Sequence, residues 1–358
     1  MSRLNAIHQM VADLHFGDAI GNDARRIRDA LRSWGYRSDL LASTLDTESA
    51  SEGALYHSYH GLDLPGTGVI LHHSIGGRVA DAALRSRSKR MMIYHNITPA
   101  EFFEPYHEDM ARLIRKGRLE LLLMRGRFAL AAADSEYNAA ELRALHYENV
   151  HVLPIIIAYE QLDLPACPRA LAALQGPERK VVFVGRIAPN KKQDDLVRAF
   201  ACYQRISPRS RLYLVGQYLP DERYYHAVQQ AIHDTGAIGV VLTGKVSQAE
   251  LNAYYQKADL FVSMSEHEGF GVPLVEAMHF GIPVLAYKCT AVPETMGDAG
   301  VLFTEKRYPE LAEMMDLLIE DQGLRERVIA GQRRRLPAFQ PASLLARLRE
   351  VIEEFERA

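Results

Sequence analysis

Short apolar runs alternate with longer amphipathic segments along the chain. The first series contains the runs LNAIHQMVA, GVILHHS, RMMIYHN, RFALAAAD and VHVLPIII. Between them, apolar residues recur at helical spacing and predict helices over residues 23–34 and 107–124. Apolar runs joined by amphipathic helices are typical of parallel strands with crossover connections. The pattern predicts a doubly wound, Rossmann-like α/β domain over residues 1–160.

A second series of the same kind follows a break in the pattern. Residues 161–178 contain several prolines and a weakly polar stretch, which predicts a linker. Apolar runs resume as KVVFVG, RLYLVG, IGVVLTG, ADLFVSM and GIPVLAY, with helical patterns over residues 196–204 and 248–257. We therefore expect a second Rossmann-like domain over residues 179–339.

The final segment, PASLLARLREVIEEFERA, has an apolar stripe at helical spacing. Leu344, Leu348, Ile352 and Phe355 share one helical face, with Leu345 beside them. Such a helix has to pack against another element, which the pattern alone does not identify.

Length and composition narrow the class of protein. A chain of 358 residues is too long for one ordinary hydrophobic core, and 48% hydrophobic with 24% charged residues is typical of a globular protein. The net charge of -3 gives no basic surface for nucleic acid. Cys167, Cys202 and Cys289 match no metal or disulfide pattern, and no apolar run is long enough to span a bilayer or to serve as a signal peptide. These features predict a cytoplasmic protein.

Ligands of doubly wound sheets bind beyond the carboxyl ends of the strands, so the turns there are informative. In GRIAPNKKQDDL, Gly185 and Arg186 follow the strand KVVFV, and Asn190 is placed to cap the next helix. Lys191 and Lys192 then lie in the first turn of that helix, where each positive charge interacts unfavourably with the helix dipole by about 0.3 to 1 kcal/mol. A bound anion would make this electrostatic environment favourable. The alternative is a solvated basic corner, balanced by the acidic residues that follow.

The turn FGDAIGND contains a second pair of glycines before a helix. Gly17 and Gly21 frame a loop that leads, through Asn22 as a candidate cap, into the helix over residues 23–34. A backbone without side chains would let a ligand approach closely, although ordinary turn glycines give the same pattern.

The stretch SEHEGFGVPLVEAMHFGIPV places two glutamates around a glycine-rich turn. Pro273 suits the first position of a helix, so GFGV is the loop that feeds it. Glu276 lies one turn into that helix, near enough to accept hydrogen bonds from vicinal hydroxyls, and Glu268 could reach another part of the same ligand. Alternatively, Glu276 only complements the helix dipole and Glu268 only faces water.

Three stretches together resemble glycosyltransferase family 4, the retaining group 1 glycosyltransferases of the GT-B fold. They are FVGRIAPNKKQDDLVRAF, VVLTGKVSQAELNAYYQKADLFVSMSEHEGFGVPLVEAMHFGIPVLAY and AVPETMGDAGVLF, and they cover most of residues 180–303. FGDAIGND, YHNITPAEFF and ADSEYNAAEL match more loosely. The resemblance implies two Rossmann-like domains facing across a cleft, the first for the acceptor and the second for a nucleotide-sugar donor. It also implies that the C-terminal helix, residues 340–358, returns to the first domain.

The resemblance further implies roles for individual residues. Arg186 and Lys191 would grip the donor diphosphate, Glu268 would hold hydroxyls of the donor sugar, and Glu276 would take the ribose hydroxyls. His95, which ends the strand RMMIYH, would reach the donor sugar from the N-terminal domain. The remaining donor-binding positions offer mainly backbone groups: Gly17, Gly21, Gly185, Phe270, Gly271 and Val272.

Other polar residues at strand ends are weaker candidates. His72 and His73 follow another apolar strand, and a structural role explains them equally well. Asp134, Ser135 and Glu136 follow FALAAA, where Ser135 is first of all a helix cap.

The expected chemistry is metal-independent transfer of a hexose without a cofactor. No two aspartates stand two positions apart, so the Asp-x-Asp metal clamp of the other large glycosyltransferase fold is absent, and cationic side chains would replace the metal. Retention follows from the family alone. The acceptor would be a hydroxyl of a glycan or lipid-linked glycan in cell-surface polysaccharide synthesis, with GDP-mannose slightly favoured as donor.

Two alternatives to transfer stay open. One is a nucleotide-sugar epimerase on the same scaffold, and the other is a non-catalytic nucleotide-sugar-binding protein. An oxidoreductase is disfavoured because neither FVGRIAPN nor YLVGQYLP supplies a Gly-x-Gly-x-x-Gly turn.

The segment MARLIRKGRLELLLMRGRF combines basic and apolar residues. It predicts either a domain helix with a solvated basic face or a peripheral contact with an anionic membrane, at the inner face of the cell membrane. The basic residues are Arg112, Arg115, Lys116, Arg118, Arg125 and Arg127.

Overall fold

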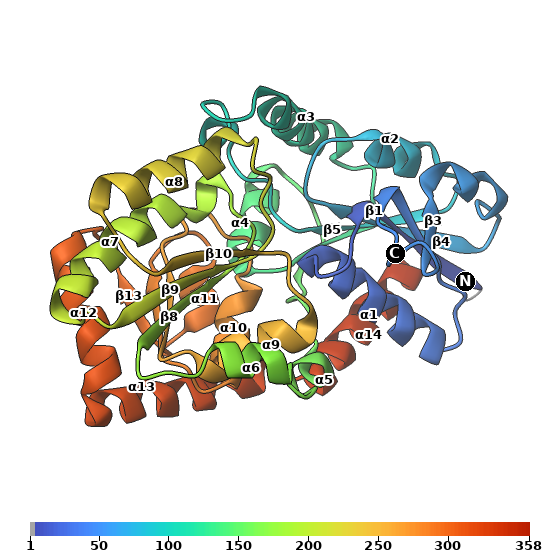
Figure 1. Cartoon of the computed structure of the whole chain (residues 1–358). Helices are drawn as coiled ribbons and strands as arrows, with labels where there is room; N and C mark the ends of the chain where they lie inside the picture. Colours follow the sequence, from blue (N-terminus) through green and yellow to red (C-terminus); the bar gives the residue numbers. More distant parts are fainter. Residues whose placement is uncertain (1–3) are drawn as a thin grey trace. The chain divides into compact units, whose positions relative to one another are not determined.

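The computed structural model describes residues 4–358 and divides the chain into two compact units (Figure 1). Unit 1 comprises the chain up to Glu101, Asp109–Ile157 and Phe339–Ala358. Unit 2 comprises Phe102–Glu108 and Ala158–Ala338. The chain therefore passes from one unit to the other four times.

Unit 1 is built on a seven-stranded parallel sheet in the order β3-β2-β1-β4-β5-β6-β7. β1 pairs with β2 on one side and with β4 on the other, so the direction of strand addition reverses there. This reversal defines the doubly wound fold that the alternating runs predict. The strands are β1 (Ala6–Leu14), β2 (Leu40–Leu45), β3 (Gly53–Leu55), β4 (Thr67–His73), β5 (Lys89–Tyr94), β6 (Leu130–Ala133) and β7 (Val150–Val152).

The helices of the N-terminal half follow the predicted pattern with one correction. They are α1 (Ala19–Ser33), α2 (Arg78–Arg85), α3 (Glu108–Met124) and α4 (Glu136–Ala144), with the 3-10 turns η1 (Tyr56–Gly61) and η2 (Ala100–Phe102). α1 begins four residues before the predicted start because Asp18 is its cap, its Oδ2 accepting the N–H of Gly21 at 2.8 Å. Asn22 therefore lies inside the helix, and its prediction as the cap was wrong.

The C-terminal helix α14 (Pro341–Arg357) closes the core of unit 1, and Figure 1 shows it in red beside α1. Its apolar stripe, from Leu344 to Phe355, is buried among strand residues that include Ile70. A Cβ at Gly68 would lie only 2.9 Å from the Phe355 ring, so glycine permits this close approach. The prediction that the last helix returns to the first domain is confirmed.

Unit 2 has a six-stranded parallel sheet in the order β10-β9-β8-β11-β12-β13. Strand addition reverses at β8, which pairs with β9 and with β11, so this sheet is also doubly wound. The strands are β8 (Arg179–Val184), β9 (Ser210–Val215), β10 (Val240–Gly244), β11 (Leu260–Ser263), β12 (Val284–Tyr287) and β13 (Val301–Phe303).

Helices of unit 2 confirm the predicted positions closely, and α9 has the predicted bounds of 248–257. None of the helices in residues 4–358 is both long and apolar enough to cross a membrane. The helices are α5 (Tyr159–Leu162), α6 (Pro168–Ala173), α7 (Gln193–Ile206), α8 (Arg223–Thr235), α9 (Gln248–Lys257), α10 (Val272–His279), α11 (Val292–Met296), α12 (Tyr308–Glu320) and α13 (Gln322–Arg335), with the 3-10 turns η3 (Pro189–Lys191) and η4 (Leu336–Phe339).

Residues 161–178, for which a linker is expected, pack on unit 2. The side-chain amide of Asn252 donates to the carbonyl oxygens of Gln161 and Leu164 at 2.9 and 3.0 Å. The N–H of Cys167 donates to the carbonyl oxygen of Ala249 at 2.8 Å. This segment is thus bound to α9 and is part of unit 2, whereas a free linker was expected.

Candidate active site

The turn after β8 is held by close backbone contacts and one buried amide. A Cβ at Gly216 would lie 2.2 Å from the carbonyl oxygen of Gly185, so glycine lets the turns after β8 and β9 approach. The buried side chain of Gln193 donates from Nε2 to the carbonyl oxygen of Arg186 at 2.9 Å. This fixes the backbone that presents the exposed side chain of Arg186 and, at the end of η3, Lys191.

Asn190 links this turn to the glutamate-containing loop instead of capping a helix. Its side-chain amide donates to the carbonyl oxygen of His267 at 3.0 Å, and its own carbonyl oxygen accepts the N–H of Glu266 at 2.8 Å. α7 starts only at Gln193, after Lys192 in the left-handed region with φ of 53°. The prediction of Asn190 as N-cap was therefore wrong, because its buried side chain satisfies a backbone group of another loop.

Lys191 and Glu268 are direct partners. Nζ of Lys191 lies 2.7 and 2.6 Å from the two carboxylate oxygens of Glu268. The loop position of Glu268 is fixed by Thr290, whose hydroxyl accepts the N–H of Glu268 at 2.9 Å and donates to its carbonyl oxygen at 2.7 Å. Two residues predicted to contact different parts of the donor are thus neighbours in the structure.

The loop before α10 has the predicted form. Gly271 is the N-terminal flanking residue, with φ of 90°, and Pro273 lies in the first turn of the helix beginning at Val272. The carbonyl oxygen of Phe270 accepts a hydrogen bond from the hydroxyl of Thr295. The backbone N–H groups at Gly271 and Val272 therefore stand at the positive end of α10, where anions are stabilised.

Glu276 lies one turn into α10 and is oriented by a tyrosine. The hydroxyl of Tyr255, a fully buried residue of α9, donates to Oε2 of Glu276 at 2.7 Å. Burial raises the pKa of Glu276, and the hydrogen bond from Tyr255 partly offsets this. Tyr255 is a site residue that the sequence analysis missed, because it stands 21 positions before its partner and belongs to an ordinary amphipathic helix.

The sequence left open that Lys191 and Lys192 are balanced by the acidic residues that follow them. In the structure these acidic residues contact other side chains. Asp194 accepts from Arg198 and from the Tyr224 hydroxyl, each at 2.7 Å. Asp195 contacts Nζ of Lys306 at 2.8 Å. Within the described residues, the carboxylate paired with Lys191 is that of Glu268.

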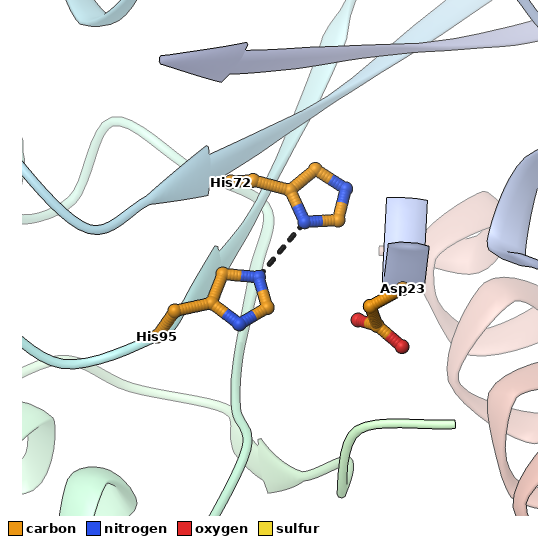
Figure 2. Close-up of side chains that lie close together, drawn as sticks. All are labelled: Asp23, His72 and His95. Atoms are coloured by element: carbon orange, nitrogen blue, oxygen red, sulfur yellow. Dashed lines mark hydrogen bonds between the residues drawn. The ribbon is translucent and has the colours of Figure 1, made fainter. Parts of the chain in front are cut away.

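In unit 1, His95 follows β5 and meets the end of β4. Figure 2 shows the rings of His72 and His95 facing each other, with Asp23 of α1 close by. Nδ1 of His72 lies 2.8 Å from Nε2 of His95, and Oδ2 of Asp134 lies 3.5 Å from Nδ1 of His95. Burial alone would lower the pKa of His95, but the hydrogen bond and charge of Asp134 raise it overall.

The glycines of FGDAIGND occupy different environments. Gly17 has φ of 82° in the turn before α1, whereas Gly21 lies in the first turn of α1 and is buried. Ser135 caps α4, as predicted, by accepting the N–H of Asn138. His73 is buried with Nε2 at 3.2 Å from the carbonyl oxygen of Gly117, so its observed contact is structural.

The structure brings together only part of the predicted set. Arg186, Lys191, Glu268 and Glu276 are all carried by turns or helices that follow the neighbouring strands β8 and β11. Gly17, Gly21 and His95 belong to unit 1.

Comparison with known proteins matches this C-terminal arrangement to a family. Residues 170–335 match the family model described as "Glycosyl transferases group 1". Similar proteins include D-inositol 3-phosphate glycosyltransferase of Segniliparus rotundus, 30% identical over 66% of this chain and 53% of that protein. O-antigen chain mannosyltransferase B of Escherichia coli is 25% identical over 65% and 62%, respectively.

A third relative is the GDP-mannose-dependent alpha-(1-6)-phosphatidylinositol monomannoside mannosyltransferase of Mycobacterium tuberculosis. It is 30% identical over 43% of this chain and 41% of that protein. The chain thus spans about half the length of the curated relatives it matches.

Solved structures extend the likeness to the whole chain. Sucrose-phosphate synthase of Thermosynechococcus elongatus has a TM-score of 0.78 at 16% identity and covers 98% of both chains. The glycosyltransferase WaaG has a TM-score of 0.73 at 15% identity over 95% of this chain and 98% of that chain. Anabaena HepE, solved with UDP-glucose, has a TM-score of 0.75 at 19% identity over 96% and 99%, respectively. The two Rossmann-like domains are therefore those of the GT-B fold, and residues 170–335 carry the pattern of the group 1 glycosyl transferases.

Proposed function

We propose that this protein is a retaining, metal-independent glycosyltransferase. It would move a hexose from a nucleotide diphosphate sugar to a hydroxyl of a glycan or lipid-linked glycan acceptor, in cell-surface polysaccharide synthesis. The observation that carries the proposal is the pairing of Lys191 with Glu268 beside the N-terminus of α10. That arrangement would offer a cation, a carboxylate and backbone N–H groups to one ligand.

Donor binding would exchange one ion pair for another. The side chains of Lys191 and Glu268 are 24% and 14% exposed, so the pair is mostly buried but still reaches solvent, where a ligand can approach it. A diphosphate offers Lys191 a stronger partner, with Arg186 of the same turn adding a forked donor. Glu268, released from Lys191, could then accept hydrogen bonds from hydroxyls of the sugar.

The rest of the donor would lie along α10. The Tyr255 hydroxyl donates a hydrogen bond to Oε2 of Glu276, so Oε1 would accept hydrogen bonds from the ribose hydroxyls. The N–H groups of Gly271 and Val272 would face the diphosphate at the positive end of the helix.

Transfer requires stabilisation of the departing diphosphate and placement of an acceptor hydroxyl. Arg186, Lys191 and the helix N–H groups would supply the charge stabilisation that a metal provides elsewhere. Retention would follow from attack on the same face of the sugar, guided by the leaving phosphate, as we expect for the group 1 enzymes.

The favoured donor is GDP-mannose. Its support is that two of the relatives are named as mannosyltransferases, one of them GDP-mannose-dependent. One structural neighbour was solved with UDP-glucose, so the donor screen also includes UDP and its sugars.

A donor screen followed by a turnover assay tests the function. Thermal shifts with UDP, GDP, ADP and their sugars should single out GDP and GDP-mannose, and NMR should then follow mannose to a glycan acceptor. Conversion of the donor to an epimer without an acceptor would identify an epimerase. Tight binding without turnover against any acceptor would favour the nucleotide-sugar-binding protein.

Peripheral contact with an anionic membrane is part of the proposal. Leu119, Leu122 and Leu123 of α3 are 54, 56 and 67% exposed, and Arg115 and Lys116 are exposed on the same helix. Exposed leucines flanked by cations are suited to the headgroup region of an anionic bilayer, where the apolar side chains insert and the cations stay at the surface. Such a contact would bring the enzyme to a lipid-linked acceptor.

A further inference from the structure

The two histidines of unit 1 adopt an unusual mutual geometry. His72 Nδ1 and His95 Nε2 are 2.8 Å apart, the ring centres are 5.1 Å apart, and the ring planes differ by 9°. This centre-to-centre separation is about the largest that two imidazoles can have at such a nitrogen–nitrogen distance. The rings therefore lie end to end in nearly one plane, each nitrogen directed at the other (Figure 2).

This geometry requires a proton between the rings. Two nitrogen lone pairs facing each other at 2.8 Å repel, whereas an N–H directed at a lone pair makes a hydrogen bond. Ligand atoms of Asp23, His72 and His95 do lie within 4.8 Å of one another. However, zinc needs about 2.0 to 2.1 Å to each nitrogen, which the gap between the two directed lone pairs does not provide.

The outer partners enclose the two rings. Oδ2 of Asp134 is 3.5 Å from Nδ1 of His95, a distance beyond an ordinary hydrogen bond, so this contact places a carboxyl beside the ring without assigning a proton to that nitrogen. Oε1 of Gln9 is 2.9 Å from Nε2 of His72. Turning the Gln9 amide changes whether that end donates or accepts, but either orientation leaves one proton between the rings.

The chain is buried along its whole length. Gln9, His72, His95 and Asp134 are each at most 7% exposed. The side-chain amide of Asn138 holds the other oxygen of Asp134. Both ring nitrogens of His95 therefore face protein groups, and a buried polar chain of this kind fixes its members in one arrangement.

We propose that Gln9, His72 and Asp134 are positioning residues for His95. They hold its ring in place, with one proton shared between His72 and His95. His95 then serves the transfer by its fixed position and does not exchange a proton with the substrate. This consequence rests on the proposed function, whereas the proton arrangement does not.

The proton arrangement can be measured without activity. In the full chain labelled with 15N-histidine, NMR should show a nitrogen–nitrogen coupling between His72 and His95 across the shared proton. The coupling should disappear in His72→Phe. His73→Phe is the matched control, because His73 is the next residue of β4 and equally buried, and it should leave the coupling between His72 and His95 in place.

Rescue by an amide separates positioning from simple packing. His72→Phe should lower kcat by about tenfold, as expected when a reacting site is slightly misplaced. His72→Asn should recover most of kcat, because its side-chain amide can donate to His95 Nε2 from a similar position.

Two results would overturn the proposal: the absence of coupling between His72 and His95, or one equivalent of tightly bound metal in the purified protein by elemental analysis. Failure to find any sugar transfer would instead count against the proposed function, since the NMR signals would still report the chain.

Discussion

The contact between Lys191 and Glu268 changes how each residue is interpreted. Each is a plausible surface charge when taken alone in the sequence. In the structure they contact each other within a loop fixed by Asn190 and Thr290. A loop restrained in this way would keep the Glu268 carboxylate in position for a ligand when Lys191 turns from Glu268 to the ligand's phosphates.

Removing either member of the pair should abolish most transfer. We expect Glu268→Ala and Lys191→Ala each to reduce kcat/KM by more than about tenfold, because each removes a group aimed at the sugar or the diphosphate. Circular dichroism should show both variants folded, with a lowered unfolding temperature, because each leaves a partly buried charge without its partner. Lys257→Ala, an exposed lysine at the end of α9, is the control for lost positive charge. Near-normal transfer in either variant would refute its role.

Tyr255 should act on donor affinity. Tyr255→Phe keeps the ring packed on Phe280 but removes the donor to Glu276. The KM for the donor should rise about tenfold, the value of one hydrogen bond to a charged group, with kcat changed by less than about twofold. Tyr254→Phe, the neighbouring residue on the same helix, should leave both constants unchanged. Steady-state kinetics with varied donor would reveal the difference, and an unchanged KM would exclude Tyr255 from the site.

The predictable and unpredictable parts of the site differ in how far apart their partners lie. Arg186, Lys191, Glu268 and Glu276 stand in local patterns of strand, glycine turn and helix start, so sequence reasoning can propose them. Tyr255 and the pairing of His72 with His95 depend on which strands and helices become neighbours, which local spacing does not encode.

At the scale of elements, helix interiors were predictable and helix starts were not. The bounds of α9 follow from apolar spacing and the capping box of Ser247 and Glu250. For α1 and α7, Asn22 and Asn190 offered equally good caps by residue type. The structure instead uses Asp18 for α1 and commits Asn190 to another loop, because tertiary contacts decide between candidate caps.

Replacing each of the two candidate caps of α1 by alanine tests which residue caps the helix. Asp18→Ala should destabilise the first turn by about 1 kcal/mol, because it leaves the N–H of Gly21 without its acceptor. Asn22→Ala should cost less than about 0.5 kcal/mol, since Asn22 has no capping role. Amide hydrogen exchange along α1 would resolve both effects. Equal protection loss in the two variants would contradict the assignment of the cap.

The exposed face of α3 should govern membrane contact. Replacing Leu122 and Leu123 by serine should reduce co-sedimentation with phosphatidylglycerol vesicles by more than about tenfold, because two inserted leucines contribute roughly 1.5 to 3 kcal/mol each. Leu317→Ser, at a residue 51% exposed on α12, is the matched control and should have no effect. Wild-type protein that stays in the supernatant would remove the membrane from the proposal.

At the scale of the whole molecule, each unit is assembled from separate pieces of chain. Phe102–Glu108 belongs to unit 2 although unit 1 lies on both sides of it in sequence. The ring of Phe102 lies 6.3 Å from that of His267, and Tyr106 lies 5.1 Å from Tyr224. Apolar spacing predicts two sheets, but this short excursion has no periodicity that would reveal it.

Deleting α14 should unfold unit 1 selectively. A chain ending at Ala338 would expose the apolar surface that Leu348 and Phe355 cover, and unit 1 should become sensitive to limited proteolysis. Residues 158–338 should remain resistant, since α14 contributes nothing to their cores. Mass spectrometry of the fragments would distinguish the two units. Equal resistance of unit 1 with and without α14 would contradict its place in the core.

The return of α14 to unit 1 also sets an order for events on the ribosome. Domains usually fold from the N-terminus as they are made, at about 5 to 20 residues per second. Here unit 1 lacks its closing helix until Pro341–Arg357 has been synthesised, after the whole of Ala158–Ala338. At these rates the delay after Ile157 is on the order of ten to forty seconds. During that time, the second unit can be complete while the first still presents an open apolar groove, which makes the nascent N-terminal half the natural client of a chaperone.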